Sequence, residues 1–169
     1  GACILDACED GYGILATDLG SDGNGGHLLT LPAGGSKLPA SLETVSQNLH
    51  TIKMDGREVF KFAVRVIEKS ANIAVEKAGL ILEDVDFFIP HQANLRIIQS
   101  AMKKLNLQSH KVYVNLDKYG NTSAASIPVA LDEAYRRNLI KKGDVVLLVA
   151  FGAGLTWGST VLRWNKQEV

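Results

Sequence analysis

The amino-acid sequence predicts a layered α/β domain, and three observations indicate this class. From residue 58 onwards, segments with helical periodicity alternate with short apolar segments of strand length. Residues 144–151 form a continuous apolar run, which is typical of a strand buried on both faces. Hydrophobic residues make up 46% of the 169 positions, which is enough for a packed core in one domain of ordinary size.

The first 57 residues carry weaker patterns. Residues 2–19 predict two strands around a turn at 9–11, and we expect these strands to belong to a sheet whose remainder is absent. The glycine-rich stretch GSDGNGG at 20–26 predicts a loop. Prolines and glycines interrupt residues 27–57, which predicts an irregular connecting segment rather than a core layer.

Helix-end signals define the elements that follow. Gly79 is suited to end the first helix at its C′ position, and Asn94 is a suitable N-cap for the second. Pro128 is compatible with the third helix only in its first turn. The predicted order is a helix from Glu58, a strand at 86–90, a helix from Leu95 to about Leu105, a strand at 111–115, a loop at 119–123, a helix at 124–138 and strands at 144–151 and 159–164.

Charge and cysteine content narrow the function classes. The chain has 18 basic and 18 acidic residues, so its net charge does not favour binding to nucleic acid or to a membrane. Cys3 and Cys8 are too few for a disulfide framework and lack metal-ligand spacing, which indicates a reducing, cytoplasmic setting. Their alternating sequence context predicts small core residues. No apolar run approaches the ~20 residues of a membrane span, no signal peptide opens the chain, and a start at Gly1 suggests truncation or cleavage.

Three short motifs follow predicted strands, where α/β sheets usually place their sites. They are PHQAN at 90–94, YGNTSAAS at 119–126 and FGAGLTWG at 151–158. Each motif alone is a weak signal, because a lone histidine is more often structural and both glycine motifs are common turns.

Together and in this order, with MDGREVFKFAV at 54–64, these motifs resemble the C-terminal half of the β-ketoacyl-acyl carrier protein synthase III family over essentially the whole chain. The resemblance implies a thiolase-like layered fold, namely the C-terminal half of a pseudo-duplicated α-β-α-β-α core. It divides the chain into trailing strands of a missing N-terminal half (1–26), a connecting segment (27–57) and a C-terminal thiolase-like domain (58–169).

The family resemblance also implies an activity. An acyltransferase of this kind joins acyl-coenzyme A to malonyl-acyl carrier protein with loss of carbon dioxide and so initiates fatty acid synthesis, without a cofactor or a metal. By motif match, His91 and Asn121 hydrogen-bond the thioester oxygen as negative charge develops there. Neutral imidazole and carboxamide groups both suit this role, because they donate N–H bonds without titrating away. The backbone N–H of Ala153 matches a second donor, although many members of the family have glycine at this position.

The resemblance assigns binding positions as well. Gly56, Ala93, Asn94 and Phe151 match positions along the substrate and coenzyme A tunnel, and Phe151, Leu155 and residues 123–126 are expected to shape the pocket. Basic residues on two helices match positions that dock the acidic carrier protein: Lys61, Arg96, Lys103 and Lys104. The helix that carries three of them has an opposite, core-facing stripe made of Leu95, Ile98, Met102 and Leu105.

The family's nucleophile is a cysteine at the start of a buried helix in the first half, and neither Cys3 nor Cys8 has that context. We therefore expect no condensing activity from this chain alone, and we expect the N-terminal half to be its partner in a homodimeric enzyme.

Three alternative functions remain open. A chain-elongating ketoacyl synthase ranks second among enzymes, because such enzymes typically use two histidines. A fragment or domain that only binds acyl carrier protein or coenzyme A is the non-catalytic alternative. A metal or nucleotide protein is weakly supported, since GSDGNGG lacks a Walker lysine, Asp18, Asp22 and Asn24 do not match a calcium-binding loop, and the four histidines lack ligand spacing.

Overall fold

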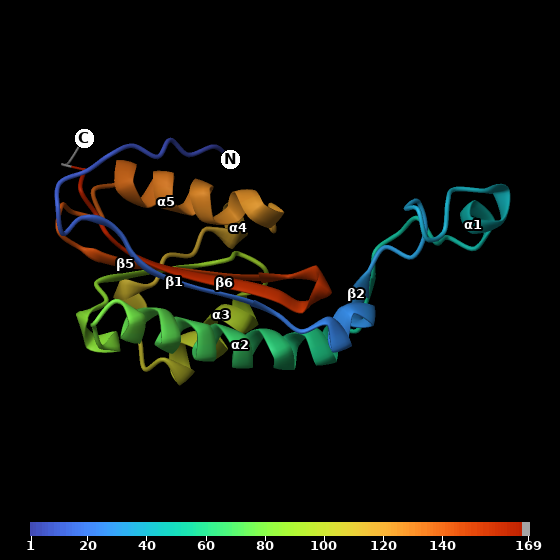
Figure 1. Cartoon of the computed structure of the whole chain (residues 1–169), viewed down its shortest axis with the longest axis horizontal. Coiled ribbons are helices and arrows are strands. Elements are labelled where there is room, and N and C mark those ends of the chain that lie inside the picture. The colour runs from blue at the N-terminus through green and yellow to red at the C-terminus, as the bar shows by residue number, and fades with distance from the viewer. Residues whose placement is uncertain (167–169) are drawn as a thin grey trace.

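The computed structural model describes residues 1–166, in which one four-stranded sheet lies between two helical layers (Figure 1). The strand order is β1-β6-β5-β4, with β4 and β5 parallel and the other pairs antiparallel. The strands are β1 (Gly13–Ser21), β4 (Phe87–Pro90), β5 (Val145–Gly152) and β6 (Thr156–Arg163). Helices α2 (Gly56–Lys77) and α3 (Leu95–Lys104) cover one face, and α5 (Ser126–Arg136) covers the other. The predicted α/β layering is confirmed.

The central strands are buried on both faces, as their apolar sequence predicts. On one face, Leu147 and Phe88 pack against Ile67 of α2. On the other face, Val146 and Ile89 pack against the α5 side of the molecule. Removal of these side chains from water is the main stabilising contribution to the fold.

The helix-end signals predicted at Gly79, Asn94 and Pro128 are confirmed, whereas the first helix starts at Gly56 rather than at Glu58. The Asp55 side chain accepts hydrogen bonds from the first N–H groups of α2, and Gly79 follows its C-cap with φ 72°. Asn94 Oδ1 accepts the Arg96 N–H at 2.8 Å at the start of α3. Pro128 is the third residue of α5, where a missing N–H has no cost.

The strand predicted at 111–115 is wrong. This segment enters from the short 3-10 helix η3 (Ser109–Lys111) and makes a single parallel bridge from Val112 to Phe88. Beyond this bridge, hydrogen bonds to side chains take the place of backbone bonds to a neighbouring strand. The backbone N–H of Asn115 donates to Gln92 Oε1 at 3.1 Å, and the side-chain amide of Asn115 donates to Glu133. The chain next forms α4 (Leu116–Tyr119).

The predictions for the N-terminal segment are partly wrong. Only the second predicted strand forms, as β1, and it pairs with β6 in this chain's own sheet. Residues 2–8 form no strand and are exposed because no neighbouring strand pairs with them; Ile4 is 96% and Leu5 84% accessible. Cys3 and Cys8 are therefore exposed rather than core residues.

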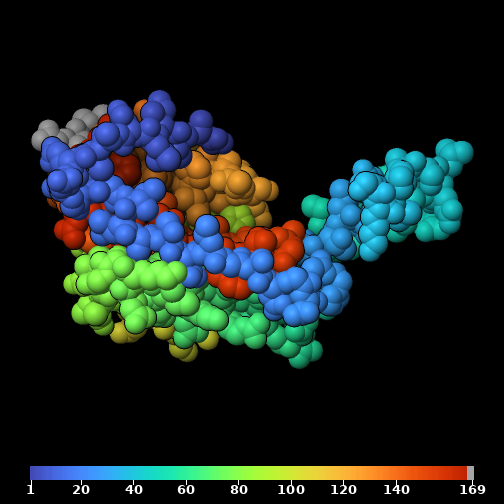
Figure 2. All heavy atoms as spheres, viewed as in Figure 1, coloured from blue at the N-terminus to red at the C-terminus, as the bar shows by residue number. Residues whose placement is uncertain are grey.

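Two short elements occupy the stretch between β1 and α2. The glycine-rich motif, predicted as a loop, forms the 3-10 helix η1 (Gly23–Leu28). Strands β2 (Leu29–Thr30) and β3 (Lys53–Met54) then pair and carry an arm whose tip is α1 (Leu42–Ser46). The arm projects away from the body of the molecule (Figures 1 and 2).

Candidate active site

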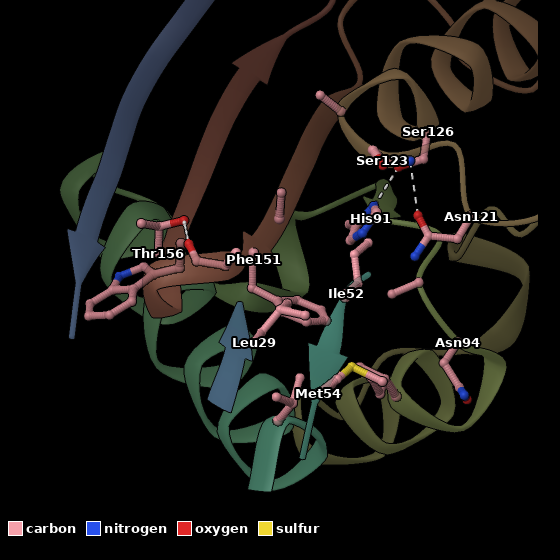
Figure 3. Close-up of a pocket in the computed structure, with 18 of the residues that line it drawn as sticks. Leu29, Ile52, Met54, His91, Asn94, Asn121, Ser123, Ser126, Phe151 and Thr156 are labelled. Carbon is pink, nitrogen blue, oxygen red and sulfur yellow. Dashed lines mark hydrogen bonds between the residues drawn. The ribbon is translucent and has the colours of Figure 1, made fainter. Parts of the chain in front are cut away.

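A pocket of about 940 Å³ opens beyond the carboxyl ends of β4 and β5, next to the base of the arm (Figure 3). All three sequence motifs reach it. Its walls are lined by residues from the arm, from α2, from the β4–α3 connection, from η4 (Ser123–Ala125) and from the β5–β6 turn: Leu29, Thr30, Leu31, Ile52, Met54, Gly56, Val59, Phe60, His91, Ala93, Asn94, Ile97, Asn121, Ser123, Ala124, Ser126, Ile127, Ala150, Phe151, Gly152, Ala153, Thr156, Trp157 and Gly158.

His91 is the first residue after β4, and its backbone is fixed by an N–H bond to Val149 O at 2.7 Å. Its ring packs edge-on against Phe151, with 5.7 Å between ring centroids. The ring Nδ1 lies 2.6 Å from Ser126 Oγ at the start of α5. The backbone of His91 is thus held by strand β5, and its side chain by β5 and helix α5.

The hydrogen bonds of Ser126 assign the tautomer of His91. Ser126 is 2% exposed, and its oxygen also accepts the backbone N–H of Gln92 at 3.3 Å. Within residues 1–166, His91 Nδ1 is the acceptor available to the Ser126 hydroxyl proton. An Nδ1 that accepts leaves the proton on Nε2, so the imidazole presents an Nε2–H donor. Burial lowers the pKa of His91 below its usual value of 6.5, which favours this neutral form.

Gln92 fixes the segment around His91 and was not identified as important from the sequence. Its side chain is 1% exposed and fully engaged. Its amide donates to Pro90 O at 2.8 Å and to Tyr113 O at 3.2 Å, and its Oε1 accepts from Asn115. These bonds tie the β4–α3 connection to the segment that leads to Asn121.

Asn121 lies beside His91 at the same end of the pocket (Figure 3). Its Oδ1 accepts the backbone N–H of Ser123 at 2.9 Å. This bond fixes the orientation of the carboxamide and leaves its Nδ2 hydrogens free for another acceptor. The geometry therefore brings two neutral N–H donors to one place.

Ala153 lies in the turn between β5 and β6. It is the first residue of the 3-10 helix η5 (Ala153–Leu155), so its N–H has no acceptor within the helix. The N–H makes no hydrogen bond to the rest of residues 1–166. Gly154 (φ 76°) and Leu155 (φ 48°) follow in left-handed conformations that turn the chain back into β6.

The remaining predicted residues divide into two groups. Gly56, Ala93, Asn94 and Phe151 line the same pocket, and Asn94 also uses its Oδ1 as the N-cap of α3. The basic residues lie outside the pocket on exposed surfaces of α2 and α3: Lys61, Arg96, Lys103 and Lys104.

Two of these lysines pair with neighbouring carboxylates. Lys61 lies 2.7 Å from Glu58, and Lys104 pairs with Glu68. The predicted core stripe of α3 needs one correction: Leu95 is 47% exposed, whereas Ile97 is buried and lines the pocket. The buried residues of α3 are Ile97, Ile98 and Ala101, and two of them, Ile97 and Ala101, belong to the core cluster that contains α2 residues.

Sequence reasoning missed several contributors to the pocket. Leu29, Leu31 and Ile52 come from the base of the arm, which the sequence marked only as irregular, and Met54 was noted only as the start of the motif at 54–64. The signal that could have identified them is that two apolar pairs, Leu29 with Leu31 and Ile52 with Met54, flank the irregular segment at 32–51. Ser126 is the last residue of the motif at 119–126, but only the three-dimensional structure reveals its hydrogen bond to His91.

Within residues 1–166, no group of three or more histidine, cysteine, aspartate or glutamate residues is placed to hold a metal ion. No helix in this part of the chain has the length and apolar character needed to cross a membrane.

The sequence matches a family model described as 3-oxoacyl-[acyl-carrier-protein] synthase III C terminal over residues 75–164. A β-ketoacyl-[acyl-carrier-protein] synthase III of Caldanaerobacter subterraneus subsp. tengcongensis is 61% identical over 166 residues, which is 98% of this chain and 50% of the relative. The β-ketoacyl-[acyl-carrier-protein] synthase III of Clostridioides difficile is 60% identical over 165 residues, which is 98% of this chain and 50% of the relative. The chain thus spans about half the length of these curated relatives.

Solved structures agree with the sequence relatives. The β-ketoacyl-[acyl-carrier-protein] synthase III of Thermus thermophilus superposes with a TM-score of 0.85 at 48% identity, covering 95% of this chain and 49% of that chain. The 3-oxoacyl-(acyl carrier protein) synthase III of Pseudomonas aeruginosa gives 0.84 at 37% identity, with 96% and 48% covered. The α/β fold predicted from the resemblance, that of a thiolase-like half, is confirmed by these superpositions.

Proposed function

This chain belongs to the β-ketoacyl-acyl carrier protein synthase III family, and from that membership we propose that it supplies half of a condensing active site. The reaction is the decarboxylative condensation of an acyl group from acyl-coenzyme A with malonyl-acyl carrier protein. The observation that carries the proposal is the pair of neutral N–H donors, His91 Nε2 and Asn121 Nδ2, at one end of the pocket.

These donors suit the decarboxylation step. When malonyl thioester loses carbon dioxide, the electron pair of the breaking C–C bond moves toward the thioester oxygen and forms an enolate. Donors that are already oriented stabilise this charge more in the transition state than in the ground state. His91 is held by Ser126, and Asn121 by the Ser123 N–H, so neither group needs to reorganise during the reaction.

The second step joins the two substrates. The enolate carbon attacks the carbonyl of an acyl group carried by a cysteine thioester, and negative charge develops on that carbonyl oxygen. The unpaired N–H of Ala153 is the donor that we assign to this oxygen. Collapse of the tetrahedral intermediate expels the cysteine thiolate and leaves the β-ketoacyl product on the carrier protein. The proposed reaction needs no cofactor and no metal.

The cysteine comes from the family's N-terminal half in this proposal. Cys3 and Cys8 are exposed and neither lines the pocket, so the chain alone is proposed to be inactive and to act as a binding fragment. We further propose that residues 2–8 add a strand to a sheet of that half, because their alternating pattern and the exposed Ile4 and Leu5 lack a partner strand here. The complete enzyme is proposed to be a cytoplasmic homodimer.

The binding surfaces follow from the same proposal. The pantetheine arm of either substrate enters along Gly56, Ala93, Asn94 and Phe151. The acidic carrier protein docks on exposed basic residues of α2 and α3, namely Lys61, Arg96, Lys103 and Lys104.

Reconstitution tests the proposed function. The chain is mixed with the N-terminal half of the Caldanaerobacter relative and incubated with acetyl-coenzyme A and then malonyl-acyl carrier protein. Denaturing mass spectrometry is expected to show one acetyl group on the N-terminal half, followed by acetoacetyl-carrier protein only when both halves are present. Acetylation of Cys3 or Cys8, or condensation by this chain alone, would overturn the assignment of the nucleophile.

A further inference from the structure

The glycine-rich motif GSDGNGG at 20–26 is not explained by the reaction, yet it contacts the turn that carries Ala153. It leaves β1, forms η1 and packs directly against η5. The Asp22 N–H donates to Leu155 O at 3.0 Å, and the Asp22 side chain accepts the Asn24 N–H at 3.2 Å. The motif is thus bonded both to itself and to the β5–β6 turn.

Leu155 is the side chain that joins the two segments. It lies two residues after Ala153 and has a φ of 48°, which leucine rarely adopts, so the surrounding structure must hold it there. Its side chain is 4% exposed and packs with Phe62 and Val66 of α2. The backbone of Gly25 forms the third side of the space that the Leu155 side chain fills.

Gly25 leaves the space that Leu155 occupies. A Cβ at Gly25 would lie 2.0 Å from Leu155 Cδ1 and 2.8 Å from its Cγ, which is far below any normal contact. A second close approach lies two residues further along, where a Cβ at Gly20 would lie 2.2 Å from the indole Cζ2 of Trp157 in β6. The two glycines therefore pack against Leu155 and Trp157, where the turn leads into β6.

We propose that Gly25 is a positioning residue for the backbone N–H of Ala153, because the absence of a side chain at Gly25 leaves the space that the Leu155 side chain fills. The catalytic role of that N–H rests on the proposed function, whereas its position depends only on this chain. A methyl group at Gly25 displaces Leu155, and the displacement reaches Ala153 through two peptide units in a strained turn.

The motif offers matched controls for this proposal. A Cβ at Gly23 or Gly26 would meet no atom within 4 Å, and neither residue has a positive φ. Gly25→Ala is therefore compared with Gly26→Ala in amide ¹H–¹⁵N spectra of the chain. Gly25→Ala is expected to shift the Ala153 and Gly154 amides, and Gly26→Ala to leave them in place. Equal shifts in the two variants, or no shift of Ala153 in Gly25→Ala, would overturn the proposal.

A double variant separates positioning from general loss of folding. In a Leu155→Ala background the space beside Gly25 is empty, so Gly25→Ala is expected to have no further effect on the Ala153 amide. Leu155→Ala alone is expected to move that amide, which keeps the test decisive if Gly25→Ala does not fold. Additive effects of the two changes would contradict the proposal.

Reconstitution with the N-terminal half gives a functional readout. Gly25→Ala is expected to lower kcat for condensation on the acetylated cysteine by about 10- to 100-fold, with KM for malonyl-acyl carrier protein unchanged, because a donor displaced by up to about 1 Å loses that much rate. An unchanged kcat contradicts the proposal. If the wild-type complex does not condense at all, the proposed function fails, while the amide spectra still decide the role of Gly25.

Discussion

Ser126 Oγ lies 2.6 Å from Nδ1 of His91, although Ser126 starts helix α5, His91 follows strand β4 and the two residues are 35 positions apart. The hydroxyl oxygen also accepts the Gln92 N–H, and among residues 1–166 the imidazole is the acceptor available to the hydroxyl proton. This single bond therefore decides which nitrogen of His91 faces the pocket with a hydrogen.

Ser126→Ala tests the tautomer assignment. Without the hydroxyl, the imidazole is free to place its proton on Nδ1 and to rotate, so the Nε2–H donor is lost for part of the time. We expect malonyl decarboxylation by the reconstituted enzyme to fall by about 10- to 100-fold. In ¹⁵N spectra of the histidine ring, the protonated nitrogen is expected to change from Nε2 alone to a mixture. Ser123→Ala is the control, because the bond from Ser123 to Asn121 uses its backbone N–H. Equal losses in both variants would contradict the assignment.

Asn121→Asp tests the second donor. The change replaces the Nδ2 hydrogens with a carboxylate oxygen at the place where the enolate charge develops, while Oδ1 still accepts the Ser123 N–H. We expect decarboxylation to fall on the order of 10²- to 10³-fold or more, since one donor is lost and repulsion is added. Acetylation of the cysteine is measured in parallel and is expected to continue, because Asn121 is assigned to the other step. A rate of decarboxylation near that of the wild type would remove Asn121 from the mechanism.

His91 also predicts a pH dependence of stability. Burial lowers the pKa of His91 in the folded chain below 6.5, whereas the unfolded chain has the ordinary value. The unfolded state therefore binds more protons as the pH falls below 6.5, and the stabilising contribution that is complete above 6.5 is lost as the pH falls toward the folded pKa. Urea unfolding between about pH 5 and pH 7.5 is expected to show a smaller loss of stability at acid pH for His91→Gln than for the wild type. Parallel curves for the two proteins would show that His91 is not responsible.

Much of the fold could be predicted because its signals are local. The Asn94 cap and the Gly79 stop depend on a few neighbouring residues, and the apolar run at 144–151 identifies a doubly buried strand by itself. The segment 111–115 alternates as a strand does but becomes a single bridge, because the side chain of Gln92, about 20 positions away, takes its hydrogen bonds. Residues 2–8 have the pattern of a strand and lack a partner, which no local pattern reveals.

The candidate site was predictable at the level of motifs and not at the level of contacts. His91, Asn121 and Ala153 were identified through their resemblance to a family, and the structure places all three on one pocket. The roles of Ser126 and Gly25 depend on contacts with residues 35 and 130 positions away. Such long-range contacts leave no periodicity in the sequence, so only the folded arrangement identifies them.

Arg96→Glu tests the docking surface. Arg96 is exposed in the first turn of α3, outside the pocket, so its charge acts on an incoming carrier protein rather than on the reacting atoms. Loss of an attraction and gain of a repulsion, each worth about 0.5–1 kcal/mol at an exposed site, should raise KM for malonyl-acyl carrier protein about tenfold. The rate with malonyl-coenzyme A is expected to stay near that of the wild type, because this substrate has no acidic protein surface. Arg136→Glu is the control, since Arg136 is also exposed but lies on α5, on the opposite face of the sheet. Equal losses with both substrates, or an equal effect of Arg136→Glu, would show that α3 does not dock the carrier protein.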